Sequence, residues 1–361
     1  MSMSNRTTPP PPIAWDDPTR AQAFDAWLQG LAPRFALNPA SLRMASADAS
    51  FRRYFRIDAE PHALIIMDAP PQHEDSAAFV KVATLMAQAG CRAPEVLDWQ
   101  ATHGFMLLTD LGQRTLLQAL QPQPEAYLPH MRQAIELLLR WQQASRPNVL
   151  PNYDEAKLRN ELGLFVPWYV QQHRGQTLTA AQANDWAALC DRLVQHNLQA
   201  PMVYVHRDFM PRNLLLDHTD ALGVVDFQDA VYGPASYDIA SLTRDAFHSW
   251  DEEVVLDLSV RYWEQARALG LFGSTPWAHD FGAFFEAVEW MGLQRHLKIL
   301  GIFARLGLRD HKPSYLADTP RFIGYARHTA RRYRALQTLL PLLDTLEGTD
   351  ATPSTWVMGR G

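Results

Sequence analysis

Short apolar runs, bounded by Pro, Asp and Gly, characterise the chain from Phe51 to about Leu111. Runs with the length and boundaries of β-strands occupy 51–57, 63–67 and 104–108. Residues 75–89 lie between the second and third runs, and their apolar positions recur at helical spacing: Phe79, Val82, Ala83 and Met86. A helical stretch also precedes the strands, around 24–31. We therefore expect a small α+β lobe over residues 21–112.

The pattern becomes strongly helical from Leu116 onward. Amphipathic stretches with apolar positions three or four residues apart cover 126–146, 153–172, 180–199, 236–247, 252–269, 278–306 and 320–345. Short apolar runs separated by polar turns interrupt these helices, and they predict small strands that form a hairpin: 202–205, 214–216 and 222–225. We expect a helical lobe over residues 113–350. The predicted fold class is thus α+β, with a small β-rich N-terminal lobe and a large helical C-terminal lobe.

Composition narrows the possible partners. The 361 residues are 47% hydrophobic, which is enough for one large or two medium domains with ordinary cores. The net charge of −6 lacks the positive field of a protein that binds the phosphate backbone, so we expect no nucleic-acid partner. Cys91 and Cys190 lie far apart and have no metal-ligand spacing, so neither a disulfide framework nor a zinc site is predicted.

The N-terminus shows no targeting signal. Residues 1–12 are polar and end in four prolines, and we expect residues 1–20 to be a disordered lead-in without the apolar core of a signal peptide. No apolar run approaches the roughly 18 residues needed to span a bilayer. These features predict a cytoplasmic protein that is not inserted in a membrane. The sequence leaves the oligomeric state open.

The segment His206–Asn213 carries the strongest chemical signal. Phosphoryl transfer needs a carboxylate that orients the attacking hydroxyl and oxygen ligands for magnesium. The segment matches H-R-D-x-x-x-x-N, in which Asp208 is the base-like residue and Asn213 is a magnesium ligand. A second metal carboxylate, Asp226, follows the last predicted strand and could face Asn213 across the hairpin. An isolated Asp in a loop usually caps a turn, but the combination predicts phosphoryl transfer that depends on ATP and Mg²⁺.

These residues resemble the catalytic and metal loops of the aminoglycoside and choline phosphotransferase family, relatives of the protein kinases. The resemblance covers about residues 40–340 and implies a protein-kinase-like bilobal fold, with Asp208 as the catalytic carboxylate and Asn213 and Asp226 as metal ligands. A finer resemblance, carried by 50–56, 226–234, 236–242 and 295–303, is to the bacterial anomeric kinases of N-acetylmuramate and N-acetylglucosamine in peptidoglycan recycling. Those enzymes form the sugar 1-phosphate.

The small lobe departs from the protein-kinase pattern. A glycine-rich loop and a strand lysine are expected, but the chain has ASADAS at 45–50 and IIMD at 65–68. Arginine forks also suit phosphate oxygens, and the strand period places Arg52 and Arg56 on one face and Arg53 on the other. We expect Arg53, with the neighbouring Ser50, to contact the nucleotide. A solvated basic edge strand is the alternative.

The segment Leu107–Gly112 leaves the small lobe, where the resemblance implies backbone hydrogen bonds to adenine. Thr109 and Asp110 are therefore expected at the nucleotide, although an ordinary strand exit would also explain them. For an amino-sugar substrate, we expect Asp229 or Asp245 to bind a hydroxyl group.

The lactyl carboxylate of N-acetylmuramate calls for a positive group, and Arg295 and His296 are the candidates, with Lys298 nearby. A solvated helix face is the competing interpretation. Asp238 begins a predicted helix, so it either satisfies the helix N-terminus or braces the catalytic loop.

Two other functions stay open. A kinase of the same fold could act on an aminoglycoside, a choline-like alcohol or a homoserine-like compound, and a cationic acceptor would call for an acidic substrate lip. The missing small-lobe lysine also permits a non-catalytic nucleotide-binding module. The presence of Asp208, Asn213 and Asp226 argues against that module.

Overall fold

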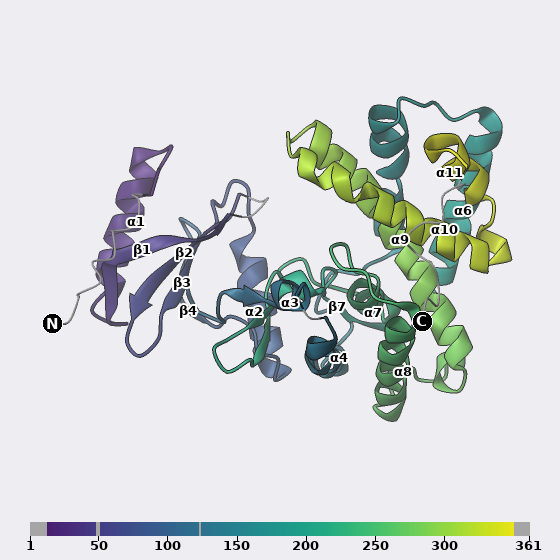
Figure 1. Cartoon of the computed structure of the whole chain (residues 1–361). Helices are drawn as coiled ribbons and strands as arrows, with labels where there is room; N and C mark the ends of the chain where they lie inside the picture. Colours follow the sequence, from purple (N-terminus) through teal and green to yellow (C-terminus); the bar gives the residue numbers. More distant parts are fainter. Residues whose placement is uncertain (1–12, 48–50, 123, 350–361) are drawn as a thin grey trace. The chain divides into compact units, whose positions relative to one another are not determined.

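The structure is a computed structural model that describes residues 13–47, 51–122 and 124–349. The chain divides into two compact units (Figure 1). The N-terminal unit comprises Met1–Arg114 and Leu215–Asp229, and the helical unit comprises Thr115–Leu214 and Ala230–Gly361. The segment 215–229 lies within the range expected for the helical lobe, yet it groups with the N-terminal unit.

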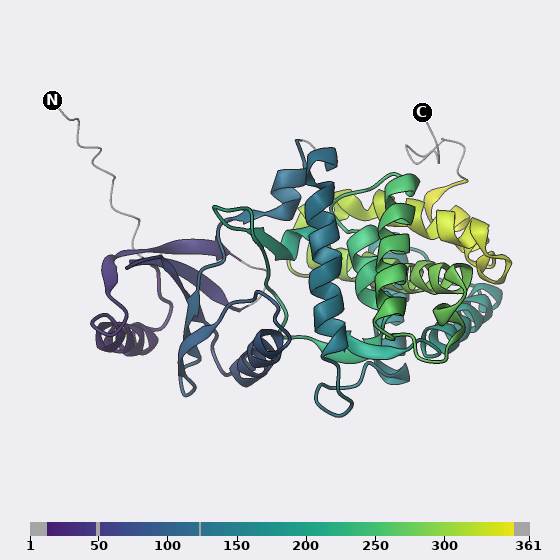
Figure 2. The same ribbon diagram turned by 90° about the horizontal axis from the view of Figure 1, so that it is seen from below.

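A five-stranded antiparallel sheet forms the N-terminal unit, in the order β1-β2-β3-β5-β4. Its strands are β1 (Leu37–Ala47), β2 (Arg53–Ala59), β3 (Leu64–Asp68), β4 (Val96–Gln100) and β5 (Phe105–Thr109), and its helices are α1 (Pro18–Leu31) and α2 (Ser76–Gln88). Asp17 caps α1 by accepting a hydrogen bond from the Thr19 amide at 2.8 Å. The apolar face of α1 packs on β2, β3 and β5 through Phe24, Leu28, Leu31, Phe55, Ile66 and Phe105. Figure 2 shows α1 beside one face of the sheet.

The segment 215–229 joins this unit through polar contacts with Arg92. β8 (Leu214–Leu216) and β9 (Leu222–Val224) form a three-stranded sheet with β6 (Arg114–Thr115). The Val224 amide donates to the Arg92 carbonyl at 2.8 Å, and the Arg92 guanidinium binds Asp217 at 2.6 Å. These contacts explain why the hairpin groups with the sheet rather than with the helices.

The helical unit surrounds one long helix. Its main elements are α3 (Leu116–Leu120), α4 (Leu128–Gln143), α5 (Glu155–Leu162), the π-helix η2 (Phe165–His173), α6 (Ala180–Asn197), β7 (Met202–Val205), η3 (Pro211–Asn213), β10 (Val231–Pro234), α7 (Ser236–Thr243), α8 (Glu252–Ala268), α9 (Phe281–Leu308), α10 (Thr319–Arg332) and α11 (Leu339–Glu347). Every residue of α9 from Ala287 to Gly301 is buried. The helices η2, α6, α7 and α10 pack against α9, which is therefore the core of the unit.

The small sheet-bearing unit and the larger helical unit confirm the predicted α+β fold class. The pattern missed the strands β1 and β4, and both pair with predicted strands. Among the described residues, no helix is both long enough and apolar enough to cross a membrane.

Candidate active site

The loop after β7 carries two of the predicted site residues. β7 pairs with β10, and the chain leaves β7 through His206, whose side chain is buried. The amide nitrogen of Asn213 donates to the Asp208 carbonyl oxygen at 2.9 Å, and the backbone amide of Asp208 donates to Nδ1 of His206 at 3.3 Å. The structure therefore brings Asp208 and Asn213 together on one internally bonded loop.

Asp238, on α7, accepts hydrogen bonds from the backbone of this loop. Its Oδ2 accepts from the His206 amide at 2.6 Å and its Oδ1 accepts from the Arg207 amide at 3.0 Å. Arg207 has a φ of 78°, a left-handed conformation that costs a non-glycine residue free energy and needs such support. Complete burial raises the pKa of Asp238 to about 6, although His206 and the two amides oppose the shift. Asp238 therefore braces the loop 206–213 rather than the start of α7.

Buried cations keep Asp208 ionised. Burial alone would raise the pKa of this carboxyl group, but the positive charges of Lys298, Arg295 and Arg207 outweigh it and hold the pKa below its ordinary value. Asp208 is thus a carboxylate that can accept a hydrogen bond from a hydroxyl group over the physiological pH range.

A buried ion cluster lies around the same loop, centred on Glu161 of α5. Glu161 accepts from Nη2 of Arg207 at 2.7 Å and lies 3.0 Å from Nζ of Lys298. Tyr153 donates its hydroxyl to the other carboxylate oxygen, and Lys298 donates to the Tyr237 hydroxyl at 3.0 Å. Burial would raise the pKa of Glu161, but Lys298 and Arg207 lower it overall. Sequence reasoning missed Glu161, because no local pattern links it to a loop 46 residues away.

Arg295, on α9, is 2% exposed, and its guanidinium lies over the Tyr237 ring at 5.2 Å. Within the described parts of the chain, neither Nε nor Nη1 of Arg295 has a hydrogen-bond partner. Such a buried cation is costly unless an anion reaches it. The solvated helix face considered from the sequence is therefore wrong for Arg295.

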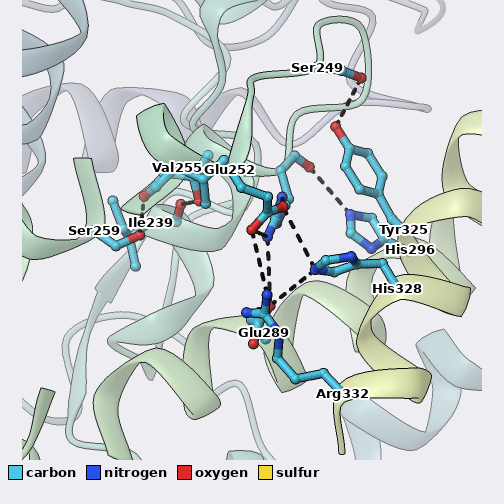
Figure 3. Close-up of polar contacts among 12 residues, drawn as sticks. Ile239, Ser249, Glu252, Val255, Ser259, Glu289, His296, Tyr325, His328 and Arg332 are labelled. Atoms are coloured by element: carbon cyan, nitrogen blue, oxygen red, sulfur yellow. Dashed lines mark hydrogen bonds and ion pairs between the residues drawn. The ribbon is translucent and has the colours of Figure 1, made fainter. Parts of the chain in front are cut away.

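His296 differs from its neighbour because it is held neutral. Burial lowers its pKa to about 3, its Nε2 lies 3.3 Å from the Arg244 carbonyl oxygen, and its ring stacks on Tyr325 at 4.6 Å. The expected positive charge on His296 is wrong, since this imidazole is part of the core. Figure 3 shows the His296 ring beside Tyr325.

A network of charged side chains joins α9 to α8 and α10 (Figure 3). Glu289 accepts from Nη1 of Arg332 at 2.9 Å, and Nε2 of His328 lies 3.7 Å from Glu252 and 3.8 Å from Glu289. Arg244 pairs with Glu252 as well. Because both carboxylates have several cationic neighbours, the network fixes the helix that carries Arg295.

Asp245 follows α7 and is fully buried. Its two carboxylate oxygens accept from the amides of Ala246 at 2.6 Å and His248 at 3.1 Å. Burial raises the pKa of Asp245 to about 7 against the opposing effect of these amides and of Arg295. The carboxylate thus shapes the loop before α8, and a contact with substrate stays a prediction.

The remaining metal candidate, Asp226, lies in the N-terminal unit. It has a φ of 65°, and its Oδ1 accepts from the amide nitrogen of Gln228 at 2.9 Å. The same nitrogen lies 3.3 Å from the exposed Asp229. Phe227 is buried, and its ring lies 4.8 Å from that of Phe79 on α2. In the described residues, no group of three or more His, Cys, Asp or Glu side chains is arranged to hold a metal.

The favoured nucleotide arginine is already paired. Arg53 forms a forked contact with Oδ2 of the buried Asp68 at 2.6 and 2.9 Å, and its guanidinium lies 4.1 Å from the Trp15 ring centroid. Arg56 forms a fork with Asp110 at 2.5 and 2.9 Å. The side chains of Arg53 and Asp110 thus have protein partners, and their contact with a nucleotide stays a prediction.

The two other nucleotide candidates, Thr109 and Ser50, stay predictions. The Thr109 amide donates to the Glu95 carbonyl at 3.1 Å, and Thr109 Oγ1 accepts from the Glu95 amide at 2.9 Å, so that amide is not available for adenine. Ser50 lies outside the described residues.

Known proteins resemble most of the chain. The family model described as "Phosphotransferase enzyme family" matches residues 41–271. The N-acetylmuramate/N-acetylglucosamine kinase of Pseudomonas aeruginosa is 44% identical over 345 residues, which cover 93% of this chain and 99% of that protein. The kinase of the same name from Neisseria meningitidis serogroup B is 46% identical over 325 residues, covering 89% and 94%.

A solved structure extends the comparison to the fold. The ADP-bound aminoglycoside phosphotransferase APH(2'')-Ib matches with a TM-score of 0.53 and 14% identity, over 81% of this chain and 95% of that chain. At this identity the match supports a common fold and nothing finer.

Proposed function

The chain belongs to the phosphotransferase enzyme family, and on that premise we propose that it transfers the γ-phosphoryl group of ATP to the anomeric hydroxyl of N-acetylmuramate and N-acetylglucosamine. The products are the sugar 1-phosphate and ADP. The observation that carries the proposal is the near-complete match to two kinases that bear the names of these sugars. An enzyme that consumes ATP in this way is expected to work in the cytoplasm.

Asp208 is the proposed catalytic carboxylate. It orients the acceptor hydroxyl and takes its proton as the sugar oxygen bonds to the γ-phosphorus and the bond to the ADP oxygen breaks. The low pKa of Asp208, caused by Lys298, Arg295 and Arg207 against the effect of burial, supports this role because the group begins the reaction ionised. The brace from Asp238 keeps the carboxylate in place.

Asn213 and Asp226 are the proposed magnesium ligands. Their amide and carboxylate oxygens are the hard donors that Mg²⁺ prefers. The Asn213 amide nitrogen is bonded to the Asp208 carbonyl, which leaves the oxygen as the amide atom suited to a metal. The ion, when bound, offsets the negative charge of the phosphate groups. Asn213 belongs to the helical unit and Asp226 to the N-terminal unit.

Arg295 is the proposed anchor for the lactyl carboxylate of N-acetylmuramate. A carboxylate would supply hydrogen-bond acceptors to the buried Nε and Nη1 atoms and offset the guanidinium charge. Asp229, which is exposed, is the better placed of the two carboxylates proposed for sugar hydroxyl groups, since Asp245 is fully buried. His296 would act through packing, because it is neutral.

An acceptor panel with coupled detection of ADP tests the proposal. We expect turnover with both amino sugars and a phosphorus NMR spectrum with the coupling of a 1-phosphate. Asp208→Asn should lower kcat by orders of magnitude and leave ATP binding largely intact. Arg295→Met should raise KM for N-acetylmuramate and change KM for N-acetylglucosamine much less, since the latter sugar lacks the lactyl carboxylate.

The alternatives give different results in the same assay. Turnover of kanamycin-like compounds without turnover of either amino sugar would replace the proposal with another kinase of the family. ATP binding without transfer to any acceptor would favour a non-catalytic module. Near-normal kcat in Asp208→Asn would remove the proposed role of that carboxylate.

A further inference from the structure

Arg207 directly precedes the proposed catalytic carboxylate, Asp208, and its backbone has a conformation that suits glycine. Its φ of 78° lies in the left-handed region, which costs a residue with a side chain free energy, whereas glycine adopts it readily. The chain thus carries an arginine where glycine would form the same turn without that strain. Strained residues of this kind are found at functional sites. It follows that the guanidinium group has a role that offsets the cost.

The guanidinium group of Arg207 reaches α5, where Glu161 binds it. Nη2 of Arg207 donates to Oε1 of Glu161 at 2.7 Å, and the two side chains are 24% and 11% exposed. The backbone of Arg207 is held by another helix, since its amide donates to Oδ1 of Asp238 on α7 at 3.0 Å. The residue before Asp208 is thus fixed by its side chain on α5 and by its backbone on α7.

Glu161 is itself fixed by two further side chains. Its Oε1 also lies 3.0 Å from Nζ of Lys298 on α9, and its Oε2 accepts from the Tyr153 hydroxyl. Lys298 donates in turn to the Tyr237 hydroxyl at 3.0 Å. The rings of Tyr153 and Tyr237 are fully buried and meet edge to face at 5.3 Å. Because both of its oxygens have partners in the core, the carboxylate is a rigid anchor for Arg207.

We propose that Glu161 is a positioning residue for the phosphoryl transfer and that it acts through Arg207. The ion pair holds the loop 206–213 so that Asp208 keeps the orientation in which its carboxylate meets the acceptor hydroxyl. Positioning matters because a displacement of about 1 Å can lower the rate of a reaction by about a hundredfold. The inference rests on the proposed function for the reaction and for the role of Asp208.

Steady-state kinetics on the full chain test the inference. Glu161→Gln keeps an oxygen acceptor but removes the charge, and it should lower kcat by about tenfold while KM for ATP and for the sugar stays within about twofold. Arg207→Gly and Arg207→Ala both remove the guanidinium group, and each should lower kcat by about tenfold to a hundredfold. Only glycine relieves the backbone strain, so Arg207→Gly should have the higher Tm of the two. Arg207→Lys can still bind Glu161 and should recover part of kcat.

A double variant tests whether the two residues act together. Because Glu161 acts through Arg207, adding Glu161→Gln to Arg207→Gly should lower kcat by a smaller factor than Glu161→Gln does in the wild type. Arg159→Ala is the matched control on α5, since Arg159 binds Glu155 at 2.7 Å and Asp191 at 2.6 Å through exposed side chains. It should keep the wild-type kcat.

Amide hydrogen exchange, measured by mass spectrometry without substrates, gives a readout that does not depend on turnover. Peptides that contain the loop 206–213 should exchange faster in Glu161→Gln than in the wild type, and peptides from the N-terminal sheet should not change. Wild-type kcat in Arg207→Gly, full multiplication of the two effects in the double variant, an equal loss of kcat in Arg159→Ala, or unchanged exchange of the loop would overturn the inference. A wild-type chain that phosphorylates no amino sugar, but whose loop loosens in Glu161→Gln, would reject the proposed function alone.

Discussion

Gly301 is a position on α9 where an added methyl group would collide with backbone atoms. A Cβ atom at this residue would lie 2.6 Å from the carbonyl carbon and oxygen of Leu164 and 2.7 Å from its Cβ. Ordinary carbon contacts are about 3.5–4.0 Å, so α9 or the start of η2 would have to move by roughly 1 Å. The nearest atoms are backbone, and no change of rotamer relieves the contact.

The expected loss of stability follows from two opposing effects. Overpacking of a core costs about 1–3 kcal/mol, and a contact with backbone belongs at the upper end. Replacing Gly with Ala inside a helix stabilises the folded state by about 1 kcal/mol. Gly301→Ala should therefore destabilise the protein by about 2 kcal/mol, which lowers Tm by roughly 4–8 °C for a unit of this size.

Gly292 provides the control within the same helix. A Cβ atom there would meet Cε1 of His296 at 3.7 Å and Cγ of Arg244 at 4.0 Å, which are ordinary contacts. Gly292→Ala should keep the wild-type Tm or raise it slightly. Scanning calorimetry on the three proteins measures the difference. The reasoning is refuted if Gly301→Ala melts at or above the wild-type temperature, or if both variants lose the same amount.

Two further substitutions test the buried carboxylates. Asp238→Asn replaces one of the two oxygens that accept from the amides of His206 and Arg207 with a donor group. The variant should lower the free energy of unfolding in urea by about 1–3 kcal/mol and should lower kcat. Unchanged values of both would contradict the brace. Asp245→Asn should flatten the pH dependence of stability. In the folded protein the pKa of Asp245 is raised to about 7 from 3.8, so folding favours the protonated carboxyl group. This contribution to the free energy of unfolding is present at low pH and is lost as the pH rises from about 4 to 7. The wild type should therefore lose about 2–3 kcal/mol relative to this variant between pH 5 and pH 8, and parallel curves would exclude the effect.

Local spacing was sufficient to predict that Asp208 and Asn213 lie close together. They belong to one eight-residue segment, and the side-chain amide of Asn213 donates a hydrogen bond to the Asp208 carbonyl oxygen. The partners that set the charge of Asp208 were not predictable in the same way. Lys298 and Arg295 come from a helix far along the chain, and only tertiary packing brings them close to Asp208.

Some strands of the N-terminal sheet could likewise be predicted from their own residues, and others could not. β2, β3 and β5 were predicted because their apolar residues fill the core. β1 contains Asn38, Pro39 and Ser41, pairs with β2 through an irregular register, and has little apolar pattern. The strand period of two also placed Arg53 on the opposite face of the strand from Arg52 and Arg56. It could not predict that the Arg53 guanidinium would bind Asp68.

The charges around the loop 206–213 give a reason to expect an anionic ligand in the helical unit. Arg207 and Lys298 share Glu161, whereas Nε and Nη1 of Arg295 have no hydrogen-bond partner among the described residues. Asp238, an electrostatic neighbour of Arg295, has a pKa raised to about 6 by burial, and its two oxygens are occupied by backbone amides. It accepts no hydrogen bond from Nε or Nη1 of Arg295. An anion that enters near Arg295 would therefore meet hydrogen-bond donors without partners, and these donors would distinguish N-acetylmuramate from a sugar without a carboxylate.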